Sequence, residues 1–347
     1  MIIDISMDWL PPELLTDDDL IEQYLHIVPR EYNTFVYLSA IPGTDTKQIM
    51  IEKPKGYVNL NMGPETIDPK DRVAVMNEGK IDKAILRVPC FQEWLTLDMC
   101  KQVNDGMAGY ANKHPGRFHT LGSVPPWGDK ASLYELERCV RELGCVGIQV
   151  AAHYGNLYLD CEEFRPFFKK ISELDVPVCV RHTVLPVQYD TILNNDTFRR
   201  QFGRCQDQAI AVGREIFSDL FEAFPNLKLV HSMLGGGFFA LTEILAPKTS
   251  KVKEEMERFN LSAAAKAREY LYRNIYFGIT VSSAWGAPQL ECAVKVMGAD
   301  RLLFGCSYPV RKEWLIHGVD FMNSLNVSEE EKKLMLGQNA QKLFNIS

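Results

Sequence analysis

The sequence has no surplus of positive charge. Its 38 lysines and arginines are outnumbered by 45 aspartates and glutamates, which gives a net charge of −7. An acidic chain is not attracted to the phosphate backbone of nucleic acids or to anionic lipid surfaces. Nucleic acids and membranes are therefore not expected as partners.

Long apolar runs, a basic N-terminal start and paired cysteines are also missing. No stretch approaches the roughly 20 apolar residues that cross a bilayer. Residues 1–5 (MIIDI) place an aspartate where the apolar part of a signal peptide would continue. The nine cysteines are scattered and form no CxxC pair, which favours reduced thiols over a disulfide framework. These absences predict a cytoplasmic protein.

The chain does contain a regular series of short apolar runs. Near-continuous apolar runs without polar alternation are typical of parallel strands that are covered on both faces. The eight runs are residues 2–5, 84–88, 120–124, 146–150, 178–180, 227–230, 275–279 and 302–304.

Longer segments with helical spacing separate these runs. Apolar residues recur at three- and four-residue steps in 98–110 and 214–224. Ser132 and Glu135 have capping-box spacing at the start of 132–143, and Ser328 and Glu331 repeat it near the end of the chain. Eight strands alternating with helices predict an α/β fold of the (β/α)₈ TIM-like barrel type, with an open doubly wound sheet as the alternative.

Two stretches are longer than ordinary connections. Residues 9–70 follow the first predicted strand, and residues 185–213 follow the fifth. In a barrel both stretches belong to the C-terminal face, where substrate sites are built, and long loops there more often act as lids than as linkers. We expect residues 1–347 to form one barrel domain, with 9–70 as a lid-like excursion.

Polar side chains stand at or after the ends of several predicted strands. In a barrel these ends converge on one cavity. We interpret Asp8, His182 and His231 as catalytic candidates, and five further residues as substrate-binding candidates. The five are Ser6, Arg87, Arg181, Ser307 and Tyr308.

Each catalytic candidate has a structural alternative. His182 and His231 each end an apolar strand and could be hydrogen-bonded core residues. Asp8 could cap the turn that follows it. Arg87 could bind a carboxylate substrate in a bidentate fashion or pair with an acid from a neighbouring segment.

Several motifs together resemble a known family. They are Asn104-Asp105, 114–118 (HPGRF), 135–137 with 144–147, 224–231 (FPNLKLVH), 298–305, Tyr308-Pro309 and 339–344 (NAQKLF). The chain resembles the amidohydrolase-related (amidohydrolase 2) family. That family includes aminocarboxymuconate semialdehyde decarboxylase, aromatic-acid decarboxylases and a pyrone-dicarboxylate lactonase. The resemblance covers nearly the whole chain and implies a (β/α)₈ barrel, with a homodimer as the expected assembly.

The resemblance also implies where a metal ion would bind. The family's ligand pair after the first strand falls on Ser6 and Asp8, its strand-five ligand on His182, and its strand-eight aspartate on Ser307. Serine hydroxyls are poor ligands for a catalytic divalent ion, which takes at least three imidazole, thiolate or carboxylate donors. The sequence therefore predicts no cofactor, with Zn²⁺ or Mn²⁺ on Asp8 and His182 as the less favoured alternative.

Without a metal, hydrolysis of an unactivated amide is difficult because nothing lowers the pKa of the attacking water. The first hypothesis is a metal-independent lyase, most simply a decarboxylase of a small cyclic or unsaturated carboxylic acid. Asp8 and His231 would exchange protons, while His182 and Arg181 would hold the anion. Two alternatives are a lactonase or other hydrolase of an activated ester or amide, and a non-catalytic barrel that binds a small acid.

Overall fold

The structure is a computed structural model of the chain. It describes residues 1–30, 34–44, 46–52, 55–56, 58–69, 71–89, 91–184, 186–187, 189–192, 198–247, 261–280 and 285–347. No helix among them is long and apolar enough to cross a membrane.

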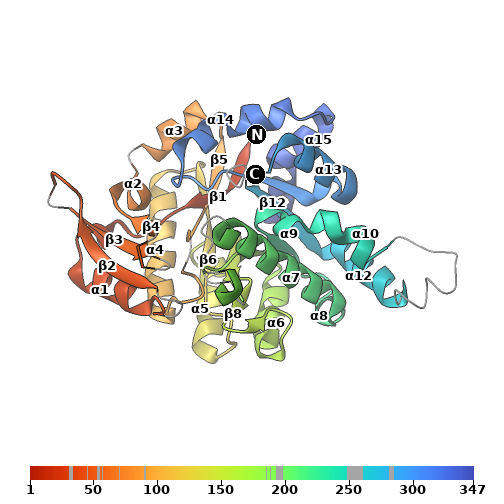
Figure 1. Cartoon of the computed structure of the whole chain (residues 1–347), viewed down its shortest axis with the longest axis horizontal. Helices are drawn as coiled ribbons and strands as arrows, with labels where there is room; N and C mark the ends of the chain where they lie inside the picture. The colour runs from red at the N-terminus through yellow and green to blue at the C-terminus, as the bar shows by residue number, and fades with distance from the viewer. Residues whose placement is uncertain are drawn as a thin grey trace.

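A barrel of eight parallel strands forms the centre of the molecule (Figure 1). The predicted (β/α)₈ fold is confirmed, and each predicted run contributes a strand. The strands, in spatial order, are β1 (Ile3–Asp8), β5 (Lys83–Arg87), β6 (Phe118–Ser123), β7 (Gly147–Ala151), β10 (Val178–Arg181), β11 (Leu229–His231), β12 (Ile275–Thr280) and β13 (Leu302–Gly305).

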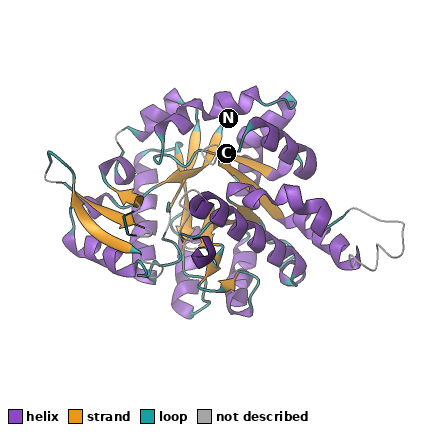
Figure 2. Cartoon of the chain, viewed as in Figure 1, coloured by secondary structure: helices purple, strands orange, loops and turns teal. Residues whose placement is uncertain are grey.

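One principal helix follows each strand of the barrel, and Figure 2 shows the helices around the central strands. These helices are α3 (Arg72–Glu78), α4 (Leu97–Lys113), α5 (Lys130–Arg141), α6 (Arg165–Leu174), α7 (Gly203–Phe217), α12 (Leu261–Asn274), α13 (Ala287–Met297) and α14 (Lys312–Ser324). Shorter helices are α8 (Leu220–Ala223), α9 (Met233–Gly237), α10 (Thr242–Leu245), α15 (Glu329–Lys333) and α16 (Asn339–Phe344).

Two predicted helix boundaries differ from the structure. Asp129, not Ser132, caps α5, because its carboxylate accepts hydrogen bonds from the backbone N–H groups of Ala131 and Ser132. The predicted helix 214–224 is instead the end of α7 and the separate α8, since the backbone turns extended at Ser218. The capping box of Ser328 and Glu331 at α15 is confirmed.

The interior of the barrel is an apolar cluster that the C-terminal segment completes. Inward-facing residues of the strands, such as Ile5, Ile85 and Val230, pack in one cluster with Phe344 of α16 and with Ile346. The segment after α15 therefore closes the N-terminal end of the barrel. Polar residues are left to the opposite, C-terminal end.

Side chains join the first and last strands of the barrel. Among the described residues, β1 and β13 share no parallel ladder. Instead, the Asp4 carboxylate accepts a hydrogen bond from the backbone N–H of Cys306 at 3.1 Å. The Ser6 hydroxyl accepts one from the backbone N–H of Ser307, also at 3.1 Å. Ser6 is thus part of the seam of the barrel.

The excursion after β1 contains a small sheet that the sequence did not predict. Helix α1 (Asp18–Ile27) precedes an antiparallel sheet of β2 (Phe35–Ala40), β3 (Lys47–Glu52) and β4 (Val58–Met62), which lies at the left of Figure 1. The short helix α2 (Pro64–Ile67) leads back to the barrel. Tyr24 of α1 packs edge-on against Phe91, in the segment that follows β5, with ring centroids 6.3 Å apart.

Candidate active site

An arginine–carboxylate pair lies at the C-terminal end of the barrel. Nε of Arg87, the last residue of β5, donates to Oδ1 of Asp8, the last residue of β1, at 3.0 Å. The same guanidinium donates through Nη2 to the hydroxyl of Ser307 at 3.0 Å. Both charged side chains are almost fully withdrawn from water. Arg87 therefore connects two of the positions at which the family resemblance places metal ligands.

Arg87 of this pair lines a small cavity inside the barrel. Its lining includes Ser6, Arg87, Arg181, Ser232 and apolar residues of the inward-facing cluster. The cavity has a volume of about 20 Å³, which is room for about one water molecule. A substrate therefore has to enter from the C-terminal mouth, above Arg87 and Arg181.

Arg181 brings a second guanidinium to the cavity. It is buried, and its Nη2 donates to the backbone carbonyl of Pro89 at 2.7 Å. Its Nε is also buried and has no hydrogen-bond partner among the described residues. A buried donor without a partner costs free energy, so this N–H is available to an anionic group of a substrate.

Burial raises the pKa of Asp8 above its ordinary value, while the charge and hydrogen bond of Arg87 oppose that rise. A carboxyl group held between these two influences is suited to gaining and losing a proton. Arg72 adds a structural contact, since its guanidinium donates to the backbone carbonyl of Asp8 at 2.8 Å.

His182 follows Arg181 at the end of β10. Its backbone N–H donates to the Ser232 hydroxyl at 3.2 Å, and its Nδ1 has no hydrogen-bond partner in the described part of the chain. Burial, together with the positive charges of Arg204 and Arg87, lowers the pKa of His182 well below its ordinary value. At neutral pH the imidazole is therefore uncharged and can exchange hydrogen bonds with a substrate.

The structure does not bring His231 to this cavity. Val230 faces the barrel interior, and neighbouring residues of a strand point to opposite faces. His231 therefore faces α7, where its Nε2 lies 2.7 Å from the Glu215 carboxylate and its Nδ1 lies 3.0 Å from Oε1 of Gln208. Its side chain is fully buried. Of the three predicted catalytic side chains, His231 therefore lies away from the cavity. Asp8 contacts Arg87 of the cavity lining, and the charge of Arg87 reaches His182.

The remaining candidates support the site from its edge. Ser307 receives the Arg87 hydrogen bond, while the Ser6 hydroxyl is engaged at the seam of the barrel. Tyr308 is buried, and its backbone carbonyl accepts from the backbone N–H of Asp8 at 2.7 Å. These contacts hold Asp8 in place, whereas no described contact directs the Tyr308 hydroxyl at the cavity.

Two supporting features were missed from the sequence. Gln149 of β7 bonds to both the N–H and the carbonyl of Val88, at 3.2 and 2.9 Å, and so holds the residue next to Arg87. A buried network joins His153, Thr183 and Asp207 with distances of 2.9 to 3.0 Å and adjoins His182 through Thr183. The contact of Gln149 could have been predicted from the sequence, because Gln149 is a polar residue at an inward position of an apolar strand.

Two buried arginines, a carboxyl group and an uncharged imidazole lie at the C-terminal end of the (β/α)₈ barrel, where enzymes of this fold have their active sites. Comparison with known families agrees. Residues 87–346 match the amidohydrolase family, and the chain belongs to it.

Its curated relatives include decarboxylases. The chain is 28% identical over 297 residues to a γ-resorcylate decarboxylase of Polaromonas sp., covering 81% of this chain and 89% of the relative. It is 26% identical over 294 residues to the 2-amino-3-carboxymuconate-6-semialdehyde decarboxylase of Dictyostelium discoideum, covering 80% and 77%. The expectation of an enzyme of this superfamily, a carbon–carbon lyase or a hydrolase, agrees with these relatives.

A solved relative corrects the prediction about cofactors. The crystal structure of a dihydroxybenzoic acid decarboxylase from Polaromonas sp., with bound manganese and the inhibitor 2-nitroresorcinol, has a TM-score of 0.71. It is 23% identical, with 99% of this chain and 96% of that chain covered. The prediction that no cofactor is needed is therefore wrong by comparison with the fold's solved members, which point to a metal cofactor.

The side chains of this chain do not by themselves complete such a metal site. Within the described ranges, no group of three or more His, Cys, Asp or Glu side chains could hold a metal ion. Of the four positions that the family uses, Asp8 and His182 offer strong donors, and Asp8 is engaged by Arg87. Ser6 and Ser307 offer hydroxyls that already take part in hydrogen bonds. The described residues at these four positions therefore do not form a complete ligand set for a divalent ion.

Proposed function

We propose that the protein is a decarboxylase that removes the carboxyl group of a small cyclic or unsaturated carboxylic acid. The observation that carries this proposal is the pair of buried guanidinium groups, Arg87 and Arg181, beside Asp8 at the mouth of the barrel. Guanidinium groups bind carboxylates through paired, charge-assisted hydrogen bonds. The names of the curated relatives support an aromatic acid as substrate.

In the proposed reaction, Arg181 holds the substrate carboxylate through its unpartnered Nε. Asp8, in its protonated form, transfers a proton to the carbon that bears the carboxylate. The bond between that carbon and the carboxylate then breaks, carbon dioxide leaves, and the electron pair of the broken bond remains with the substrate. Asp8 is left as a carboxylate that Arg87 stabilises, and it regains its proton from water.

His182 has a different role in this proposal. Because its pKa is lowered, its uncharged ring can hydrogen-bond a hydroxyl or carbonyl group of the substrate without competing for the proton of Asp8. Its unpartnered Nδ1 is the atom that meets the substrate. His231 has no step in this mechanism, since α7 engages both of its ring nitrogens.

The excursion of residues 9–70 is proposed to act as a lid over the site. Its helix α1 packs on Phe91 in the segment after β5, and that segment begins directly beyond Arg87. A cover in this position would exclude water from a reaction that generates charge. The homodimer and the cytoplasmic location remain predictions.

Product analysis tests the proposed function. Purified enzyme, with and without added Mn²⁺, is mixed with a panel of hydroxybenzoates that includes 2,6-dihydroxybenzoate, and released carbon dioxide is measured. We expect release by the wild type and loss of about 100-fold or more in Asp8→Asn. Arg181→Met is expected to raise KM about tenfold. Arg141→Gln removes an exposed arginine that is paired with Glu137, and it should change neither the rate of carbon dioxide release nor KM.

Two outcomes would contradict the proposal. Ring opening of lactones or ester cleavage without loss of carbon would assign a hydrolase to the same residues. Tight binding of the acids with no turnover under any metal condition would indicate a binding protein.

A further inference from the structure

A second pocket lies at the opposite end of the barrel from Arg87 and Asp8. Lys228 directly precedes β11, Tyr276 is the second residue of β12, and Arg301 directly precedes β13. These positions mark the N-terminal ends of the three strands. The pocket is open to solvent and has a volume of about 670 Å³. No step of the proposed decarboxylation uses it.

Positive charge dominates this pocket although the protein as a whole is acidic. Its lining contains four cationic side chains, Lys228, Arg268, Arg273 and Arg301, and one carboxylate, that of Glu269. The net charge of the chain is −7. A local concentration of cations on an acidic protein focuses an attractive field for anions.

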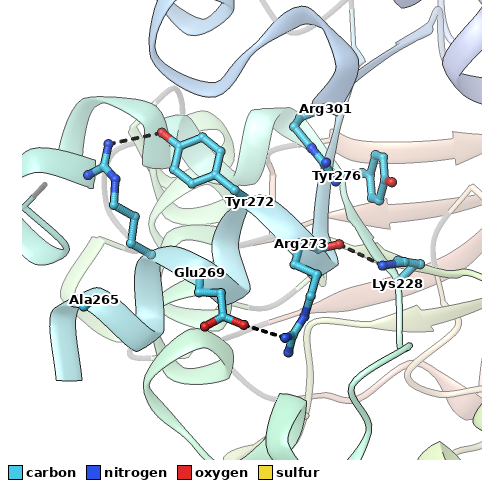
Figure 3. A pocket seen from close by; sticks show the side chains of 8 residues that line it. Lys228, Ala265, Glu269, Tyr272, Arg273, Tyr276 and Arg301 are labelled. Atoms are coloured by element: carbon cyan, nitrogen blue, oxygen red, sulfur yellow. Dashed lines mark hydrogen bonds and ion pairs between the residues drawn. The ribbon is translucent and has the colours of Figure 1, made fainter. Parts of the chain in front are cut away.

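The cations of the pocket lie close enough to repel one another. Figure 3 shows Lys228, Arg273 and Arg301 brought together from three separate segments. Burial lowers the pKa of Lys228, and the charges of Arg301 and Arg273 lower it further. The ammonium group of Lys228 donates to a backbone carbonyl, that of Arg273, at 2.8 Å. Arg273 and Arg268 are already paired with Glu269 and Glu243, so an anion would act mainly on Lys228 and Arg301.

Arg301 is the least satisfied of these groups. Its Nε lies 3.2 Å from the carboxylate of Asp300, and its guanidinium lies over the ring of Tyr276 at 4.9 Å. Its two terminal amino groups make no hydrogen bond within the part of the chain that the structure describes. Its side chain is 20% exposed, so these amino groups can be reached by a dissolved anion.

An adjoining hollow extends the charged surface. It has a volume of about 290 Å³ and shares Tyr276 and Arg301 with the first pocket. Its other charged lining residues are Lys342 of α16 and Asp300. Arg301 thus stands between the two hollows. A ligand with several negative groups can reach cations on both sides of it.

We propose that this pocket is a binding site for a small polyanion, such as a diphosphate or a tricarboxylate, with Lys228 and Arg301 as its principal contacts. The site is separate from the proposed active site and does not depend on the proposed function. Its chemistry is that of charge-assisted hydrogen bonds from ammonium and guanidinium groups to oxyanions.

Calorimetric titration with pyrophosphate and, separately, with citrate tests the proposal and distinguishes the two kinds of anion. We expect one of them to bind the wild type, and Arg301→Gln and Lys228→Met each to weaken that binding about tenfold or more. Arg141→Gln is the matched control, because it removes an exposed arginine elsewhere on the surface. Circular dichroism and thermal unfolding of each variant check that it is folded.

A second measurement uses the wild type alone and locates the anion. An amine-acylating reagent is applied with and without the anion, and modification of Lys228 is followed by peptide mass spectrometry. Protection of Lys228 is expected. The proposal is overturned if neither anion binds at about 10 mM, if Arg141→Gln weakens binding as much as Arg301→Gln, or if Lys228 stays unprotected while the anion is bound.

Discussion

The guanidinium of Arg87 and the carboxylate of Asp8 form a buried ion pair with a separation of 3.0 Å between Nε and Oδ1. The pair joins β1 to β5 at the end of the barrel where substrates bind in this fold. Because Arg87 also reaches Ser307, it connects strands and loops that are more than 200 residues apart. Its removal should therefore affect both stability and chemistry.

Replacing one residue of this ion pair should lower the free energy of unfolding. We expect Arg87→Met to lower the free energy of unfolding by about 3–5 kcal/mol, since it leaves the Asp8 carboxylate buried without its partner. Asp8→Asn should also be destabilising, because it leaves the buried Arg87 guanidinium without its carboxylate partner. Chemical denaturation measures both values.

The double variant Asp8→Asn/Arg87→Met is the control for the ion pair. Replacing both partners removes the unpaired charge, so it should be more stable than Arg87→Met alone. Strict additivity of the two single effects would show that the two side chains do not interact.

The lowered pKa of His182 has a defined consequence for stability. Below the ordinary pKa of 6.5 the unfolded chain protonates this histidine, whereas the folded protein does not until its lowered pKa is reached. Stability should therefore fall as the pH is lowered from 6.5. In His182→Asn the fall in stability between pH 6.5 and 5 should be smaller than in the wild type, as measured by urea unfolding across this range.

His153 should give the opposite dependence of stability on pH, and it therefore serves as the control. Burial lowers its pKa, but the hydrogen bond and charge of Asp207 outweigh burial, and the net shift is upward from 6.5. The stability that it contributes is present in full below 6.5 and is lost as the pH rises through its raised pKa. His153→Asn should therefore lose more stability at pH 5.5 than at pH 8.

His231 should matter for stability rather than for chemistry. We expect His231→Gln to lower the free energy of unfolding by about 3 kcal/mol, because it breaks the buried contact with Glu215. The kcat of the fraction that remains folded should stay within about twofold of the wild type, whereas Asp8→Asn should lose about 100-fold. A large fall in the kcat of folded His231→Gln would show that His231 does take part in catalysis.

Gln149 should act on the site through Val88. Its amide bonds to both backbone groups of Val88, so Gln149→Leu leaves two buried polar groups unpaired, at a cost of about 2–4 kcal/mol. It should also raise KM, because Arg87 next to Val88 loses its alignment. Steady-state kinetics and denaturation measure the two effects.

Asn274 offers a matched control at the other end of the barrel. Its amide donates to the backbone carbonyls of Pro225 and Leu227, at 2.9 and 2.7 Å. Asn274→Leu should cost a similar stability but leave KM unchanged. An equal rise of KM in both variants would show that general loosening, not alignment of Arg87, is responsible.

The strands of the barrel could be predicted from the sequence because parallel strands buried on both faces are continuous apolar runs. The sheet of β2, β3 and β4 was missed since its short strands mix polar with apolar residues. Motif residues also have structural roles that the sequence could not assign. Asn339, for example, donates to the backbone carbonyls of Ala299 and Leu302.

The site could be predicted only in part, and His231 shows why. Its place at the end of a strand suggested convergence with His182, but its orientation depends on which residues of β11 face inward. Val230 faces inward, so His231 cannot. The hydrogen-bond partners of His231, Glu215 and Gln208, lie on a helix that begins in a segment predicted as a loop. No local sequence pattern predicts these contacts.

Hydrogen-bonded ladders of parallel strands can form in more than one alignment, because every backbone offers the same groups at regular intervals. The junction between β1 and β13 has no such freedom, since Asp4 and Ser6 each bond to one particular N–H. A shift of one residue at this junction would take the N–H of Cys306 away from the buried Asp4 carboxylate and would move Ser307 relative to Arg87. The first and last strands can therefore meet in one alignment only, and this alignment fixes where Ser307 stands relative to Arg87.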